Sequence, residues 1–224
     1  MKKVLLILLI LIVAIVISTL MIGTAQNKKT LPVLNPCNVN PILVDSAIQR
    51  KCIGHKIGEF SFINQDSNII THNFMDNKIA VVDFFYVSCP SVCPVMTSQI
   101  KRIHDYDFGP LNNELAILSH TVWPELDSVA VLNQYANRYG ANSKRWCFLT
   151  GNKKELYNMA RKHYLVVPDV FDTNFQHGGE ADFIHTENVV LVDRKGRIRG
   201  YYDGTSPSEI SELIDDIKFL LYPN

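Results

Sequence analysis

Short apolar runs separated by polar turns extend along most of the chain, and they predict an alternation of strands and helices. The most prominent central run, Ile79–Val87, is rich in β-branched and aromatic residues, which predicts a buried strand. Apolar residues then recur at helical spacing as far as Tyr106. Pro94 suits a helix that begins near Cys93, because proline is tolerated in the first turn. The motif SCPSVCP therefore places two cysteines between a buried strand and the helix that follows it.

The remaining pattern predicts elements on both sides of this strand and helix. Strands are expected at Phe60–Ile63, Asn68–Thr71, Glu114–Val122, Arg145–Leu149, Asn188–Asp193 and Arg197–Tyr202. Helices are expected from Asp127, as the N-cap, to Gly140, and at Asn152–His163, Ser206–Leu221 and, more briefly, Leu43–Arg50. This order is typical of a thioredoxin-like α/β fold, a mixed central sheet flanked by helices. Ligand sites in such sheets lie beyond the carboxyl ends of the strands, where the two cysteines fall.

The N-terminus predicts a membrane anchor. Lys2 and Lys3 precede an uninterrupted apolar run, Val4–Ile22. A helix of about 19 residues, at about 1.5 Å per residue, matches the hydrocarbon core of a bilayer. A cleavable signal peptide usually has a shorter apolar run of about 7–15 residues, although the small residues at 23–25 keep cleavage open as an alternative.

These features divide the chain into three parts. We expect residues 1–25 to form the N-terminal transmembrane helix, 26–57 a linker, and 58–224 the thioredoxin-like domain. An export-type segment, combined with cysteine chemistry suited to an oxidising compartment, predicts a single-pass protein of the cell membrane. Its soluble domain is then expected on the extracytoplasmic, periplasmic side.

Charge and cysteine content narrow the function. The 22 basic and 22 acidic residues balance, so nothing in the charge favours nucleic acid as a partner. Five cysteines are too few for a disulfide-framework scaffold. Cys37 and Cys52 bracket a short stretch, and in an exported protein they suggest a local disulfide worth about 3 kcal/mol, the alternative being two unrelated thiols.

Cys89 and Cys93 carry the candidate chemistry. The positive end of a helix dipole favours thiolates, which suit disulfide exchange or a soft metal ion such as Cu(I). Their C-x-x-x-C spacing is longer than that of the common redox dithiol and suits two thiolates that converge on one metal. A metal held for transfer needs a third ligand. Among the seven histidines, His185 is the strongest candidate because it precedes a predicted hairpin strand, and His120 and His177 are weaker ones.

Several motifs, in order, resemble the Sco/SenC family of copper chaperones. They are FFYVSCPSVCPVM, LSHTVWPELDSVAVLNQYANRYG, RWCFLTG and FIHTENVVLVDRKGRIRGYYDGT. The resemblance implies a membrane-tethered thioredoxin-like domain in which Cys89, Cys93 and His185 bind one copper ion, as Cu(I) and also as Cu(II). It further implies that the protein delivers copper to the copper-bearing subunit of cytochrome c oxidase, or keeps the cysteines of that binuclear centre reduced.

The chain departs from the family pattern at two acidic positions. Ser91 stands where an acidic residue commonly separates the cysteines, and Trp123 where an aspartate often precedes Pro-Glu. Neither change removes a primary ligand. The first hypothesis is therefore a copper-binding and transfer protein rather than an enzyme. The second is a thiol–disulfide oxidoreductase acting on cysteines of an exported or membrane partner, with Cys89 and Cys93 as its redox-active pair.

Overall fold

The computed structural model describes residues 9, 11–18, 30–44, 47–167 and 186–223, which belong to two compact units, Met1–Leu31 and Pro32–Asn224. In the first unit, residues 11–18 are helical and expose their large apolar side chains. Within the part of the chain that the structure describes, no helix has both the length and the apolar character needed to cross a membrane. The predicted anchor over Val4–Ile22 lies in part outside the described residues.

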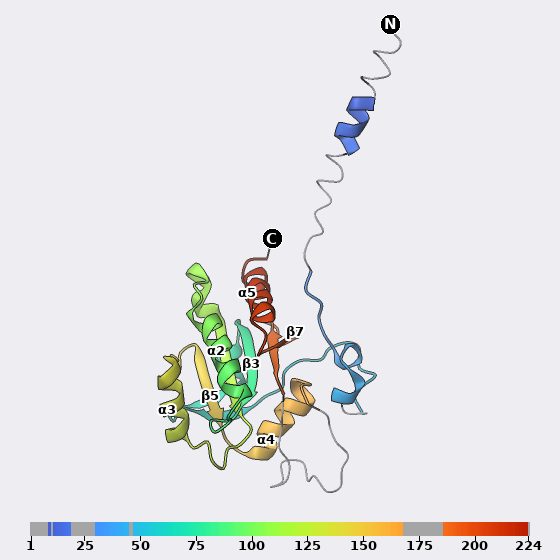
Figure 1. The fold of residues 1–224 in the computed structure, drawn as a ribbon. Coiled ribbons are helices and arrows are strands. Elements are labelled where there is room, and N and C mark those ends of the chain that lie inside the picture. The colour runs from blue at the N-terminus through green and yellow to red at the C-terminus, as the bar shows by residue number, and fades with distance from the viewer. Residues whose placement is uncertain (1–8, 10, 19–29, 45–46, 168–185, 224) are drawn as a thin grey trace. The chain divides into compact units, whose positions relative to one another are not determined.

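The second unit is built on one mixed β-sheet (Figure 1). Its described strands are β1 Ser61–Asn64, β2 Ile69–Thr71, β3 Ile79–Phe85, β4 Leu115–Thr121, β5 Trp146–Thr150, β6 Asn188–Val192 and β7 Ile198–Asp203. They lie in the order β2-β1-β5-β4-β3-β6-β7. β3, β4 and β5 are mutually parallel neighbours, whereas the other pairings are antiparallel. All seven residues of β3 are buried, as expected for a central strand covered on both faces.

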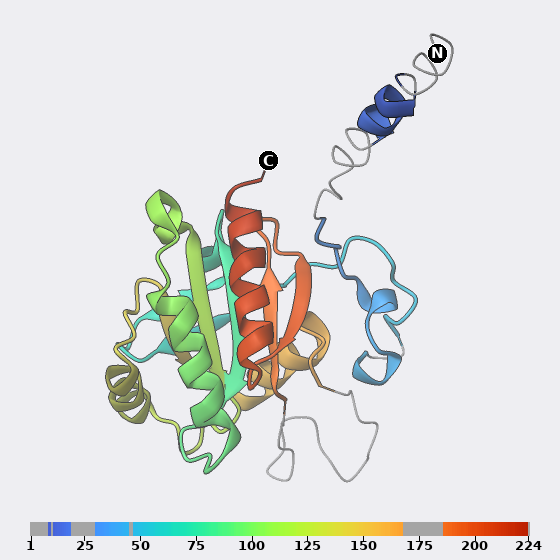
Figure 2. The same cartoon turned by 45° about the horizontal axis from the view of Figure 1, so that its top comes forward.

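Helices cover both faces of this sheet. They are α2 Val92–Asp105, α3 Val129–Tyr139, α4 Lys153–Asn158 and α5 Pro207–Leu221. Figure 2 shows α2 and α5 side by side in front of the sheet, with α4 on the far side. Because side chains alternate along a strand, β3 directs Val82 and Phe84 towards the cluster that contains Leu156 and Tyr157 of α4. The thioredoxin-like mixed sheet predicted from the sequence is therefore confirmed.

Capping residues set the helix boundaries, and one prediction about them is wrong. Ser128, not Asp127, caps α3, because the Ser128 side chain accepts a hydrogen bond from the Val131 N–H. The predicted end of this helix is confirmed, since Gly140 takes a left-handed conformation with φ of 68°. The helix predicted over Asn152–His163 begins one residue later than expected, because Asn152 is its N-cap, and it changes after Asn158 into a π-helical turn, Met159–His163.

The segment that precedes the sheet also differs from its prediction. A helix was expected over Leu43–Arg50. The structure instead has a 3₁₀ turn at Pro41–Leu43 and a turn over residues 47–50. Pro41 supplies the fixed φ of the first position, and the Asn40 side chain accepts a hydrogen bond from Ile42. These local bonds satisfy the backbone of a short turn without a helix.

Candidate metal centre and thiol pair

Both cysteines lie where β3 gives way to α2. β3 ends at Phe85, and Cys89 stands in the connection four residues later. Cys93 is the second residue of α2, and Pro94 follows it in the first turn, where a missing N–H costs no helical hydrogen bond. The two thiols are free, and the residues are only 9% and 7% exposed.

The helix start gives the two thiols different acidities. The Cys93 backbone N–H donates to the Cys89 sulfur at 3.4 Å. Burial alone raises the pKa of Cys89. Hydrogen bonds from the Cys93 and Ser91 N–H groups, the Cys93 thiol and the Tyr86 hydroxyl outweigh it and lower that pKa from 9.0 to about 7. The pKa of Cys93 rises to about 12, chiefly because the thiol is buried and also because it lies beside Cys89.

This difference predicts the order in which the thiols react. At pH 7 we expect iodoacetamide to modify Cys89 on the order of 100-fold faster than Cys93, since the larger thiolate fraction of Cys89 outweighs its lower intrinsic nucleophilicity. Peptide mass spectrometry after timed alkylation measures both rates. Cys147, which is fully buried and has a pKa raised to about 12, is the internal reference for a slow thiol. Equal rates at Cys89 and Cys93 would contradict the assignment.

A cavity of about 520 Å³ opens onto the pair. Its described lining includes Cys89 and Cys93 on one side, and Thr186, Glu187 and Asn188 at the start of β6. The topology explains this meeting of distant segments. β6 runs antiparallel to β3, so that the beginning of β6 lies near the carboxyl end of β3.

The histidines predicted as third ligands fall in two places. His185 and His177 lie outside the described residues. His120 is fully buried in β4, and its ring packs against Phe84, at 5.2 Å between ring centroids, and against Tyr164, at 5.6 Å. Among the residues that the structure describes, no three His, Cys, Asp or Glu side chains come together as a metal site.

Two buried aspartates near the site have roles that were not predicted from the sequence: Asp83 was not a candidate, and Asp127 was expected only as a helix N-cap. Asp83 lies within β3 and accepts a hydrogen bond from Ser119. Burial raises its pKa to about 7 despite that bond. The Asp127 carboxylate accepts the N–H of Val87, at 3.2 and 3.3 Å, and the hydroxyl of Thr121. Asp127 thereby joins the ends of β3 and β4 just ahead of the cysteines. An acidic residue inside an apolar run, VVDFF, was the available signal for Asp83.

A mixed sheet that carries a dithiol at the start of the helix after its central strand defines a thioredoxin-like dithiol protein. The sequence model of the SCO1/SenC family matches residues 50–221, most of the chain. This protein therefore belongs to the SCO1/SenC family, which confirms the resemblance found in the sequence.

Individual relatives agree with this assignment. The SCO1 protein homolog of Bacillus subtilis is 25% identical over 167 residues, which cover 74% of this chain and 83% of that protein. BsSco, a member of the Sco family of cytochrome c oxidase assembly proteins with a disulfide switch, superposes with a TM-score of 0.60 at 23% identity over 77% of this chain and 96% of its own. Copper-bound ScoI of Bradyrhizobium japonicum superposes with a TM-score of 0.57 at 22% identity, over 75% of this chain and 99% of its own. At these identities the two structures show a shared fold.

Proposed function

We propose that this protein binds one copper ion through the Cys89 and Cys93 thiolates and the His185 imidazole. In this proposal it delivers the ion to the binuclear copper centre of cytochrome c oxidase, or keeps the cysteines of that centre reduced. The observation that carries the proposal is the cavity shared by the two thiols and Thr186. His185 is covalently joined to Thr186, and consecutive Cα atoms are about 3.8 Å apart. A histidine at this position is therefore within one residue of the cavity wall.

The donor set suits Cu(I). Soft thiolates and imidazole are ligands that copper prefers, and a ligand must be deprotonated before it binds. Cys89 supplies a thiolate near neutral pH, whereas Cys93 gives up its proton when the metal binds. A thiolate of the acceptor protein that enters the cavity replaces these ligands one at a time, so that copper is cargo rather than a resident cofactor. Cu(II) is a second oxidation state that the same site is proposed to hold.

Membership of the SCO1/SenC family supports this assignment, since relatives that share the fold include a copper-bound ScoI and a cytochrome c oxidase assembly protein. We further propose that residues 1–25 anchor the protein in the cell membrane as a single helix, with the thiol domain on the extracytoplasmic side. The apolar run over Val4–Ile22 supports the anchor.

The unequal thiols favour a second function, thiol–disulfide exchange. In this reaction the Cys89 thiolate attacks a partner disulfide and forms a mixed disulfide, which releases one partner thiolate. Cys93 then loses its proton and attacks the Cys89 sulfur, which releases the second partner sulfur. The pair ends as a disulfide and two electrons pass to the partner. The partner's two sulfurs take up the Cys93 proton and one proton from solvent, which replaces the proton that Cys89 had already released. An acidic Cys89 beside a less acidic Cys93 suits these two roles.

A copper titration distinguishes the two functions. The full-length protein is prepared anaerobically with Cys89 and Cys93 either reduced or joined as a disulfide, and Cu(I) is titrated in competition with a chromophoric chelator. We expect one Cu(I) per reduced chain and none per oxidised chain, because the disulfide removes both thiolate ligands. If the reduced protein binds copper no better than the oxidised protein, the copper function is wrong. Reduction of a partner disulfide then remains as the activity of the pair.

A further inference from the structure

One residue that lines the cavity of the thiol pair, Leu43, lies ahead of the segment that matches the family model. The family match begins at residue 50, whereas the compact unit that carries the thiols begins at Pro32. The residues ahead of the match contain most of a loop whose ends, Cys37 and Cys52, are joined by a disulfide with their Cα atoms 5.1 Å apart. The Cys37 N–H also donates to the Lys51 carbonyl at 3.2 Å, next to the disulfide.

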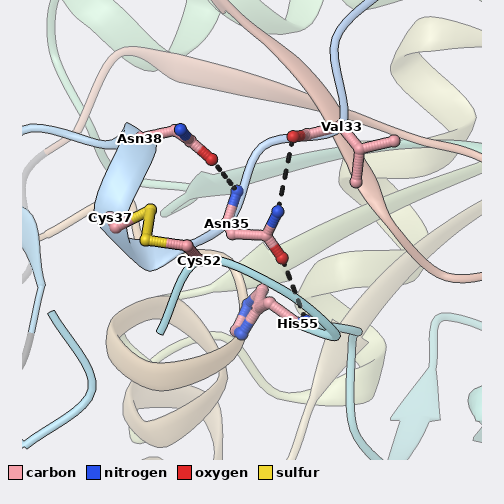
Figure 3. The surroundings of a disulfide bond; sticks show 6 residues. All are labelled: Val33, Asn35, Cys37, Asn38, Cys52 and His55. Atoms are coloured by element: carbon pink, nitrogen blue, oxygen red, sulfur yellow. Dashed lines mark hydrogen bonds between the residues drawn. A yellow bond between two sulfur atoms is a disulfide. The ribbon is translucent and has the colours of Figure 1, made fainter. Parts of the chain in front are cut away.

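This disulfide-closed loop, residues 37–52, is fastened to the domain on both sides. Figure 3 shows Asn35 beside the disulfide, where its side-chain oxygen accepts the His55 N–H at 3.1 Å. The His55 ring in turn hydrogen-bonds to the His163 carbonyl at 2.8 Å, at the end of the π-helical turn. Within the loop, Val44 is 3% exposed and belongs to the core cluster. The described residues of the loop, 37–44 and 47–52, are therefore part of the folded domain.

A short turn in the loop directs three consecutive residues to three environments. The Gln49 side chain donates to the Pro41 and Val44 carbonyls, at 2.9 and 3.0 Å, and so holds both ends of the turn Pro41–Leu43. Ile42 is 71% exposed, Val44 enters the core, and Leu43 lines the cavity with Cys89 and Cys93. The Leu43 side chain has no donor or acceptor, so it acts on this cavity through its bulk.

We propose that Leu43 is a specificity-determining residue that limits the size of the group able to reach Cys89. The disulfide-closed loop holds the Leu43 side chain at the cavity wall, so that a slim incoming group passes and a bulky one is hindered. In this way a segment that lies mostly ahead of the family match selects which partner sulfur atoms reach Cys89. The proposal rests on the proposed function only in taking Cys89 as the group that meets the partner.

Alkylation of Cys89 by a small and a large reagent tests the size limit. The full-length reduced protein reacts with iodoacetamide or with a maleimide on a long polyethylene glycol chain, and peptide mass spectrometry gives the rate at Cys89. In Leu43→Ala we expect a several-fold faster reaction with the large reagent and an unchanged reaction with iodoacetamide. In Leu43→Trp the large reagent is expected to react several-fold more slowly. Ile42→Ala, in the same turn but facing solvent, is the matched control and is expected to change neither rate.

The double variant Cys37→Ser with Cys52→Ser tests whether the loop closure holds the wall. It is expected to behave as Leu43→Ala does, because the loop ends are no longer joined. The proposal fails if the Leu43 variants leave the large reagent unaffected, or if both reagents change equally, which indicates altered thiol acidity or a loosened fold. No copper enters this assay, so its outcome is independent of the copper titration.

Discussion

Replacement of His185 by alanine is expected to lower the affinity for Cu(I) by at least about 100-fold, or about 2.7 kcal/mol. Changes to groups that only orient a metal ligand cost about 10- to 100-fold, and the loss of a ligand itself costs more. The proposed site keeps its two thiolates in this variant, but the three-coordinate ion becomes two-coordinate. Cys93→Ser is expected to have a larger effect, because the remaining thiolate and imidazole do not enclose a soft ion.

Competition titration with a Cu(I) chelator measures these affinities. His177→Ala is the matched control, since His177 lies eight residues away in the same stretch and is expected to leave the affinity unchanged. The same proteins are assayed for reduction of a partner disulfide. If His185→Ala retains full copper affinity, His185 is not the ligand. If it loses copper but retains disulfide exchange, the two activities of the pair are separable.

Replacement of His120 by leucine is expected to stabilise the fold by about 1–3 kcal/mol at pH 7. Neither nitrogen of the His120 ring makes a hydrogen bond of good geometry among the described residues, and the nearby Leu118 and Asp83 carbonyls offset its burial only in part. Each buried polar group without a hydrogen bond lowers the stability of the fold by about 1–3 kcal/mol. The ring is enclosed by Phe60, Phe62, Phe84 and Tyr164, so an aliphatic side chain of similar volume suits its surroundings better.

The same substitution is expected to reduce the acid sensitivity of the fold. Burial lowers the pKa of His120 from 6.5 to about 3 in the folded protein, against a smaller opposing effect of the Leu118 and Asp83 carbonyls. Between these values the unfolded chain binds more protons than the folded chain. Stability is therefore lost as the pH falls below 6.5, by up to about 1.4 kcal/mol per pH unit, until the pH reaches about 3. In His120→Leu this contribution disappears.

Urea unfolding of both proteins at pH 7 and pH 5 measures the effect, with unchanged m-values as the sign of unchanged compactness. His72→Leu, at a partly exposed position, is the control for the gain of an apolar side chain. A less stable His120→Leu variant would show that the ring nitrogens of His120 are hydrogen-bonded in the protein, and the expectation would be wrong.

Ser91 now has a structural context. It precedes the first residue of α2, lines the cavity, and donates its backbone N–H to the Cys89 sulfur. An acidic side chain at this position adds a negative charge beside Cys89 and disfavours the thiolate. Serine at residue 91 adds no such charge, and it therefore helps to keep the pKa of Cys89 at about 7.

The sequence predicted the sheet and the place of the thiols because these depend on short-range patterns. An apolar β-branched run, turn residues and capping residues lie close together in the chain, so β3 and the start of α2 fall within one or two residues of their predicted positions. Short-range patterns gave the wrong N-cap for α3, because two neighbouring residues were both suitable. Asp127 and Ser128 are both good N-cap residues, and only the folded chain shows that Asp127 is needed elsewhere, by Val87 and Thr121.

Long-range contacts were beyond the sequence. Nothing in the position of Leu43 along the chain indicates that it lines the same cavity as Cys89. This arrangement depends on a loop closed by a disulfide and on a hydrogen bond to a distant helical turn. The thiol acidities likewise depend on the burial of Cys93 and on the N–H groups and side chains that donate hydrogen bonds to Cys89. For His120, the polar residue at the end of an apolar strand suggested a ligand at the sheet edge. The structure encloses it in aromatic rings.

The residues before the loop have a consequence for how the sheet is protected. β7 is an outer strand, and an outer strand with unpaired backbone groups is a template for another chain. Here Leu34 bridges to Ile198, and Arg199 donates to the Pro32 carbonyl at 2.7 Å, so the chain blocks its own edge. A protein that begins at residue 58 lacks these residues, and its β7 edge is exposed to intermolecular pairing and aggregation. Soluble fragments for study should therefore retain the residues from Pro32 onwards.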